Sequence, residues 1–216
     1  MKHKVLMLAC SAMCLSTAAV AAPTAYMSDA AFSAANGATA LTLQSFEVAP
    51  TATATSLNFG NVAFNCTGST YCPGFFGRST VYATDGIFSV FFATPDSATF
   101  TFSSTITSFG VDVVGLGDVG VTNFFINNGS GPLALQSGYS APGGTVTFAG
   151  LTDSAGFTTV TFTGTRRDDG IFFDRLRFGT ALAGAVPETS TWAMMISGFG
   201  LVGGAMRRRR ASAVFA

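Results

Sequence analysis

The fold is decided by one stretch of the chain, Asp168-Asp169-Gly170-Ile171-Phe172-Phe173-Asp174-Arg175-Leu176-Arg177-Phe178-Gly179. Asp169-Gly170 is a turn dipeptide, and the apolar, aromatic residues that follow it predict a β-strand over 171–178. Strict period-2 alternation puts the even-numbered residues from Phe172 to Phe178 on one face, with Asp174 among them. If that face is the core, Asp174 lies beside it and needs a cation or several hydrogen-bond donors, because an unpaired buried carboxylate is costly.

Similar short alternating runs, separated by turn dipeptides such as Asp85-Gly86 and Gly143-Gly144, precede this strand. They predict strands at 41–48, 57–64, 79–83, 86–93, 98–103, 106–114, 120–127, 133–137, 145–149 and 157–163. The segment 30–40 is rich in Ala and Ser and suits a short helix or an unsettled arm. Many short strands without a long amphipathic helix predict an all-β fold, a β-sandwich of jelly-roll type.

The N-terminus has the three parts of a secretory signal peptide, which we expect to span residues 1–21. Lys2 and Lys4 supply the charge, 5–15 is apolar, and Ala19-Val20-Ala21 is a small-x-small cleavage site. We expect cleavage after Ala21; acylation at Cys10 as a lipoprotein is the alternative. The exported domain is then 22–180, and the small, uncharged residues 181–185 form a linker.

The C-terminal segment 186–210 has a polar hinge, an apolar run and a basic cluster, in that order. The uncharged stretch 189–206 would span about 27 Å as a helix, close to the ~30 Å hydrocarbon core of a membrane. Trp192 suits one membrane interface, and the basic stop 207–210 keeps its end cytoplasmic by the positive-inside rule. The pattern predicts a single transmembrane helix that follows the exported domain.

This segment resembles the PEP-CTERM sorting signal. The residues that carry the resemblance are Val186, Pro187, Glu188, Trp192, Arg207, Arg208, Arg209 and Arg210. Thr189 stands where the family has its second proline. The resemblance implies processing by an exosortase-type membrane peptidase. It also implies export across the inner membrane of a Gram-negative bacterium, membrane anchoring, and then a place at the cell surface or in the extracellular matrix. A plain C-terminal membrane helix is the alternative.

Composition excludes several functional classes for the exported domain. The only histidine is His3 and the only lysines are Lys2 and Lys4, all within the signal peptide. A Ser-His-Asp triad, His-liganded zinc, a Schiff-base lysine and a Walker phosphate loop are therefore excluded. Between residues 22 and 188 the net charge is −6, which argues against nucleic acid as a partner. Residues 115–120 fit G-x-G-x-x-G, but a strand-like run follows them, so no nucleotide is expected.

Cys66 and Cys72 are the only cysteines after the signal peptide. An even pair this close in an oxidising compartment predicts a disulfide around a surface loop. A metal or redox role is the alternative.

The stretch 168–179 also resembles the closing strand of galactose-binding-like and carbohydrate-binding jelly-roll domains. In those domains a structural calcium often lies between a Glu near the first strand and the Asp of the last. The resemblance implies such a calcium at Glu47 and Asp174, although Arg175 replaces the second Asp of the family's pair. The alternative is that Asp174 pairs with an arginine or a backbone turn. No other cofactor is expected.

These observations lead to a non-catalytic surface protein of the envelope or exopolysaccharide matrix that binds glycan. Aromatic residues available for sugar stacking are Tyr71, Phe75, Phe76 and Tyr139. One alternative is a structural exoprotein without a ligand. Another is an enzyme that cleaves polysaccharide with two carboxylates, Glu47 and one of Asp96, Asp153 and Asp168.

Overall fold

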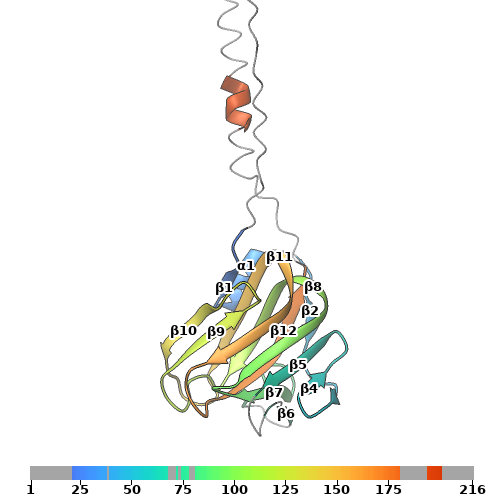
Figure 1. Ribbon diagram of the computed structural model, residues 1–216, viewed down its shortest axis with the longest axis vertical. Coiled ribbons are helices and arrows are strands. Elements are labelled where there is room, and N and C mark those ends of the chain that lie inside the picture. The colour runs from blue at the N-terminus through green and yellow to red at the C-terminus, as the bar shows by residue number, and fades with distance from the viewer. Residues whose placement is uncertain are drawn as a thin grey trace, which may run out of the picture. The chain divides into compact units, whose positions relative to one another are not determined.

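The computed structural model describes residues 21–37, 39–67, 72, 74–77, 81–180 and 194–200. Val20–Gly184 forms one compact unit, shown in Figure 1. Of the chain's remaining part, residues 194–200 are described, and they are helical. Nowhere in the described ranges is there a helix with the length and apolar character that membrane crossing requires. Most of the predicted span 189–206, and nearly all of the signal peptide, lie outside the described residues.

The compact unit consists of strands and one short helix, so the all-β prediction is confirmed. The elements are β1 (Thr24–Tyr26), α1 (Asp29–Asn36), β2 (Thr42–Gln44), β3 (Thr51–Ala52), β4 (Ser56–Asn58), β5 (Val62–Thr67), β6 (Gly74–Gly77), β7 (Phe88–Ala93), β8 (Ser97–Val114), β9 (Thr122–Asn127), β10 (Leu133–Tyr139), β11 (Val146–Gly164) and β12 (Gly170–Gly179).

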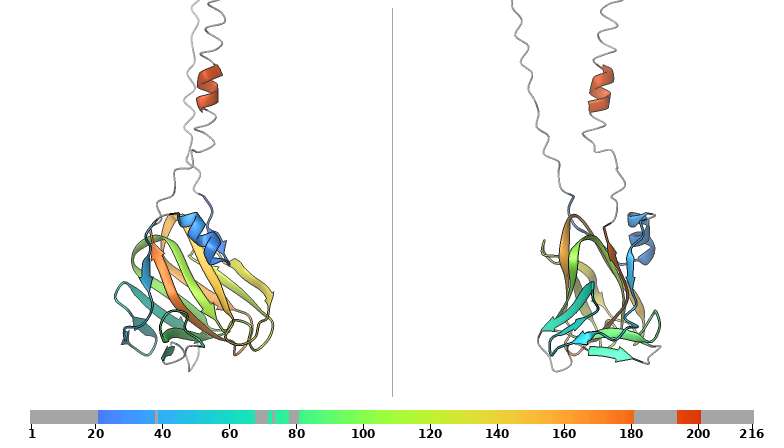
Figure 2. Two further views of the ribbon diagram at one scale, coloured as in Figure 1. Left: turned by 180° about the vertical axis from the view of Figure 1, so that it is seen from behind. Right: turned by 90° about the vertical axis from the view of Figure 1, so that its right-hand side faces the viewer.

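All strand pairs are antiparallel, and the main path through the sheet is β10-β9-β11-β8-β12-β7-β6. The two longest strands, β8 and β11, pair with each other along almost their whole length. The first half of β8 also pairs with β5, while its second half pairs with β12. On β11, the segment 150–152 pairs with β1 and the segment 161–164 pairs with β9. The long β8–β11 pair therefore belongs to two groups of strands, which gives the sandwich-like arrangement of Figure 2.

The hydrophobic core lies between these two groups and is built mainly of phenylalanine. Phe100 and Phe162 from one group meet Phe109 and Phe173 from the other, with ring centroids 4.8 to 5.8 Å apart. All four side chains are fully buried. Between the two halves of β8, residues 103–105 are polar and exposed, and the register of β11 against β8 shifts between Thr152 and Thr159. The sheet bends at this bulge, because an extra residue on one strand increases local twist.

Helix α1 packs on the outer face of the sheet, where two glycines make room for it (Figure 2). Gly110 of β8 and Gly150 of β11 are paired in register, and the ring of Phe32 lies over both. A Cβ on Gly110 would come within 2.7 Å of Phe32 Cε1 and 2.8 Å of Phe148 Cζ. Asn36 fixes the helix end, because its Oδ1 accepts a 2.6 Å hydrogen bond from Ser108 Oγ.

The predicted strands differ from the observed ones in several ways. β1, β3 and β6 were not predicted, and the predicted strand 41–48 is only the short β2. The predicted strands 98–103 and 106–114 are parts of one long bent strand, β8. The predicted strands 145–149 and 157–163 are likewise parts of one strand, β11. The predicted strand 57–64 is instead β4 and β5 with a turn between them, in which Gly60 has a φ of 90°. Val81 and Tyr82, predicted as strand, form a turn. In these latter cases a local polar or glycine-containing segment either bends a strand or ends it.

Strand β12 does not follow strict alternation, so the predicted grouping of its side chains is wrong. Its register against β8 shifts between Asp174 and Arg177, and Arg175 has a φ of 48°. This bulge exchanges the two faces. The core therefore contains Ile171, Phe173, Leu176 and Phe178. Asp174 is buried, but on the opposite face from the core.

Replacing Gly110 with alanine tests the packing of α1. The added methyl group would overlap the rings of Phe32 and Phe148, so we expect Gly110→Ala to destabilise the protein by about 1–3 kcal/mol. Urea unfolding of the purified chain measures this loss. In a Phe32→Leu background the same substitution should cost clearly less. An equal cost in both backgrounds would show that Phe32 is not what the glycine accommodates.

Candidate functional site

Glu47 and Asp174, which the sequence pairs as calcium ligands, both bind one loop, residues 84–88. Asp174 Oδ2 accepts hydrogen bonds from the backbone N–H groups of Thr84 at 2.6 Å and Asp85 at 2.7 Å. Glu47 Oε1 accepts them from Ile87 at 2.8 Å and Phe88 at 2.9 Å. The two carboxylates therefore hold the two halves of the same loop.

Gly86 lies at the centre of this loop, and its backbone conformation favours glycine. Its φ is 81°, in the left-handed region that favours glycine. A Cβ there would also lie 2.2 Å from Glu47 Cδ. The turn dipeptide Asp85-Gly86 thus positions the backbone N–H groups that the carboxylates bind.

Burial has a marked effect on Asp174, whose side chain is fully inaccessible. It raises the pKa of Asp174 to about 6, although the N–H groups of Asp85, Arg175 and Thr84 stabilise the charged form and limit the rise. The nearby negative charge of Asp85 adds to the increase. The carboxylate is thus ionised at neutral pH and is held there by backbone donors.

The donor set decides how well calcium fits these residues. Calcium requires six to eight oxygen ligands in most protein sites. Asp174 Oδ2 and Glu47 Oε1 already accept two or more N–H or O–H groups each, and Asp174 Oδ1 accepts the N–H of Arg175 at 2.7 Å. Among the described residues, no three acidic, histidine or cysteine side chains gather in a way that could hold a metal. The carboxylates of Asp174 and Glu47 fit a backbone clamp better than a metal shell, and calcium at this place stays a prediction.

A small aromatic cluster, which includes Tyr82 just before the clamped loop, lies on the outer face of the sheet. Tyr82 stacks on Phe172 with ring centroids 4.2 Å apart, and the ring centroid of Phe91 lies 4.8 Å from that of Phe172. The bulge at Arg175 explains why Phe172 lies here and not in the core.

The remaining side chains of the bulge bind α1. Arg175 contacts Asp112 through Nε at 2.9 Å and Asp29 of the helix through Nη2 at 2.9 Å. Arg177 Nη2 lies 2.7 Å from the other oxygen of Asp29. Burial raises the pKa of Asp29, but hydrogen bonds and charge from Arg177, a hydrogen bond from Ser33 and the charge of Arg175 outweigh it and hold that pKa below its usual value.

The predicted disulfide is confirmed: Cys66, at the end of β5, is bonded to Cys72. Among the predicted sugar-stacking residues, Phe75 is half-buried and stacks on Phe88, with ring centroids 5.0 Å apart. Tyr139 is half-buried and packs against the core. Tyr71 and the side chain of Phe76 lie outside the described residues.

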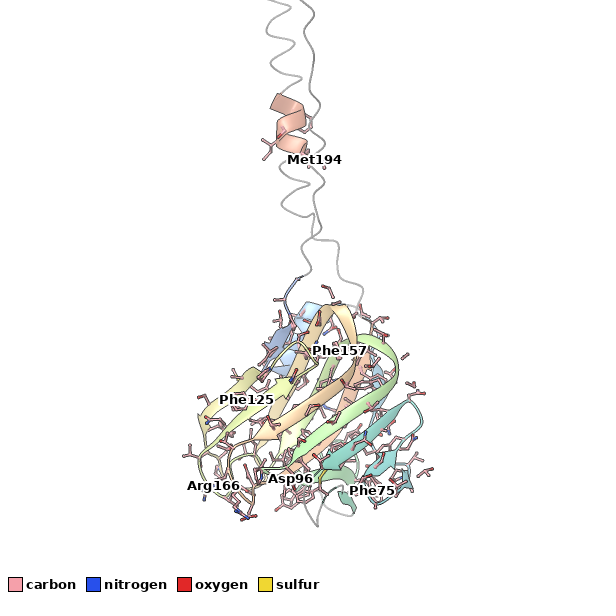
Figure 3. The ribbon with its side chains drawn as sticks, viewed as in Figure 1. Phe75, Asp96, Phe125, Phe157, Arg166 and Met194 are labelled. Carbon is pink, nitrogen blue, oxygen red and sulfur yellow. A yellow bond between two sulfur atoms is a disulfide. The ribbon has the colours of Figure 1, made fainter. Side chains whose placement is uncertain are left out.

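The carboxylates proposed for a hydrolytic reaction have separate environments. Asp153 is buried and accepts hydrogen bonds from Asn128 Nδ2 at 2.7 Å and from the N–H of Ala155 at 2.9 Å. Asp168 is exposed and lies 3.9 Å from Arg167. Asp96, labelled in Figure 3, is half-buried next to the start of β8. Among the described residues, no hydrogen bond or ion pair joins any of these three carboxylates to Glu47.

A pocket that the sequence does not indicate lies between β1, α1 and the bend of β11. Its volume is about 250 Å³. Its polar lining consists of Thr24, Tyr26, Thr107, Ser108, Thr152, Asp153 and Ser154. Ala21 and Ala22, which flank the expected cleavage site, also line it. These residues are far apart in the sequence, so no local motif could have revealed the pocket.

Every residue of the predicted sorting signal lies outside the described residues: Val186, Pro187, Glu188, Trp192, Arg207, Arg208, Arg209 and Arg210. The sorting signal thus stays a prediction from the sequence.

No protein-family model matches the chain, and no curated protein matches it. Solved structures similar to part of it include a catalytic domain of a GH87 alpha-1,3-glucanase in complex with tetrasaccharides, at 14% identity over 65% of this chain and 28% of that one, with a TM-score of 0.36. Another is the catalytic unit of the GH87 alpha-1,3-glucanase from Streptomyces thermodiastaticus strain HF3-3, at 17% identity over 65% of this chain and 26% of that one, with a TM-score of 0.35. The chain spans about a quarter of the length of these structures. At such TM-scores the likeness defines neither its fold nor its activity.

The raised pKa of Asp174 predicts an unusual dependence of stability on pH. The ordinary pKa is 3.8 and the folded-state pKa is about 6, so between these values the folded state binds more protons than the unfolded state. This contribution to stability, about 3 kcal/mol, is present at pH 4 and is lost as the pH rises through about 6.

Urea unfolding in a chelating buffer from pH 4 to 7.5 measures this effect. The Asn side chain of Asp174→Asn does not titrate, so we expect this variant to lose about half of the dependence of unfolding free energy on pH. Asp169, whose pKa is also raised to about 6, should supply the remaining half. A slope unchanged in Asp174→Asn would contradict the assignment.

Proposed function

We propose that this chain is an exported, surface-anchored protein that is sorted by a PEP-CTERM signal and acts by binding and not by catalysis. One observation carries the proposal: the order of polar hinge, apolar run and four arginines in 186–210. An exosortase-type peptidase is the partner that such a signal requires. The compact unit Val20–Gly184 supplies a separate domain for display.

The carboxylates support a non-catalytic role. A glycosidase needs two carboxyl groups free to act on one bond, about 5 to 10 Å apart. Glu47 uses its Oε1 to hold Ile87 and Phe88, and both oxygens of Asp153 accept protein donors. Each of these groups has a structural task that competes with acid-base chemistry.

A glycan ligand is favoured by one observation, the pocket beside β1. Hydroxyl groups of five Ser and Thr side chains, one carboxylate and one tyrosine line a space of about 250 Å³. Hydroxyl-rich sugars bind through such polar groups together with an aromatic face. We also propose that the sandwich is of the jelly-roll type, which suits a carbohydrate-binding module. A structural exoprotein without ligand is the alternative.

The sorting signal predicts that the C-terminus of the surface protein is shortened. After processing, we expect the surface-exposed protein to lack the peptide that contains Arg207–Arg210, as mass spectrometry of its C-terminus would show. Glu188→Ala should block the processing. Thr189→Ala is the matched control, because this position already departs from the family pattern and should tolerate change. Recovery of surface protein with all four arginines attached would contradict the proposal.

The pocket predicts a variant that loses glycan binding without loss of fold. Ser154 is exposed at the pocket, so Ser154→Phe should fill it and weaken binding on a glycan panel by about tenfold or more, at least ~1.4 kcal/mol. Thr158→Phe, exposed on the same strand outside the pocket, is the control and should bind as the parent does. Absence of binding by the parent protein across the panel would favour the structural alternative.

A further inference from the structure

A second pocket, with a volume of about 300 Å³, lies beside the bend of β8. It is bounded by that bend, by β2, by the turn between β4 and β5, and by the end of β12. Pockets that bind small ligands have volumes of about 300 to 1,000 Å³. The space is therefore large enough for a ligand of the size of a sugar unit.

The polar side chains of this pocket are free to bind a ligand. Six of its lining residues carry a hydroxyl or amide group and are exposed: Thr42, Asn61, Ser103, Ser104, Thr105 and Thr180. Within the ranges that the structure describes, none of these six side chains makes a hydrogen bond. In the pocket beside β1, by contrast, Tyr26, Ser108 and Asp153 each bond to another side chain. The second pocket thus offers more unused donors and acceptors than the first.

Two hydrogen bonds keep the walls of the second pocket in place. The N–H of Ser103 donates to the carbonyl oxygen of Asn61 at 3.0 Å, which joins the bend of β8 to the turn between β4 and β5. Within that turn, the side-chain oxygen of Asn58 accepts the N–H of Gly60 at 2.8 Å. The walls are thus fixed before a ligand arrives, which lowers the entropy cost of binding.

The lining also decides the charge of a suitable ligand. Its polar side chains are hydroxyls and an amide, and none of the lining residues that the structure describes is charged. Ile106 and Phe178, which belong to the buried core, supply the apolar part of the wall. An ion would lose hydration here without meeting an opposite charge, and that loss is costly. Hydroxyl and amide groups instead exchange hydrogen bonds with an uncharged, hydroxyl-rich ligand.

We propose that this pocket is a second binding site and that its ligand is an uncharged sugar. The inference rests on the proposed function, because it assigns the second site to the same glycan that the pocket beside β1 binds. The amide of Asn61 can donate and accept at once, which suits two neighbouring hydroxyl groups of one sugar ring. The hydroxyl of Ser104 adds a further donor and acceptor.

The two pockets lie on consecutive parts of one strand. Ser103–Ile106 lines the second pocket, and Thr107 and Ser108, the next residues of β8, line the first. Extended chain rises about 3.3 Å per residue, so Ser104 and Thr107 lie roughly 10 Å apart along the strand. An oligosaccharide of a few units can therefore contact both pockets. Because two linked contacts bind more tightly than either alone, the protein should prefer longer chains.

The test measures how affinity depends on the length of the sugar chain. The full-length protein in mild detergent is titrated calorimetrically with uncharged gluco-, manno- and galacto-oligosaccharides of two and six units. We expect the parent to bind at least one hexasaccharide about tenfold more tightly than the matching disaccharide. Ser104→Phe should fill the second pocket and reduce the affinity for the hexasaccharide to that for the disaccharide.

Two further variants support the assignment. Asn61→Ala removes the amide without filling the space, and it should weaken hexasaccharide binding by about threefold to tenfold, the effect of one lost hydrogen bond. Thr158→Phe, exposed on β11 and outside both pockets, is the control and should keep the length dependence of the parent. Urea unfolding shows whether each variant folds as the parent does.

The outcomes separate the second site from the proposed function. Hexasaccharide binding that is unchanged in Ser104→Phe would overturn the second site, and its loss in Ser154→Phe would leave the proposed function intact. If the parent binds none of the oligosaccharides, both the second site and the glycan ligand of the proposed function are overturned. Tighter binding of uronic acid hexasaccharides than of uncharged ones would overturn the assignment of an uncharged ligand.

Discussion

The bulge at Arg175 is the constraint on which the outer face of this sandwich depends. By adding one residue between Asp174 and Arg177, it lets β12 keep apolar side chains in the core at both ends while polar ones face outward. Asp174 then holds the loop 84–88, and Arg175 and Arg177 hold α1 through Asp29. With regular alternation, either these contacts or the core packing of Leu176 and Phe178 would be lost.

Helix α1 illustrates how charge and packing combine. The guanidinium of Arg177 lies 5.6 Å from the ring centre of Phe32 and 5.4 Å from that of Phe148. The same two rings occupy the space that Gly110 leaves open. A cation over an aromatic face is stabilised electrostatically. The ion pair with Asp29 orients the Arg177 guanidinium over these rings. An eight-residue helix, too short to be stable alone, is thereby held on the sheet.

The sequence was sufficient for the all-β class and the disulfide, because alternation and cysteine spacing are local signals. It also brought Glu47 and Asp174 to one place, through a family resemblance. It could not show that residues 103–105 bend a strand and do not end it, since polar residues suit either role. The bulge at Arg175 was invisible for the same reason. Gly117 and Asp169 meet only through tertiary packing across some fifty residues of chain, which no spacing rule captures.

The position of β12 in the sheet has a consequence for the order of folding. This strand pairs with β2, β7 and β8, which lie far earlier in the sequence, and it supplies Phe173 to the centre of the core. A chain that emerges with its N-terminus first cannot close the core until Gly179 has emerged. Such non-local pairing folds slowly. The unfinished domain therefore remains open through most of its emergence, with the aromatic core still exposed to its surroundings.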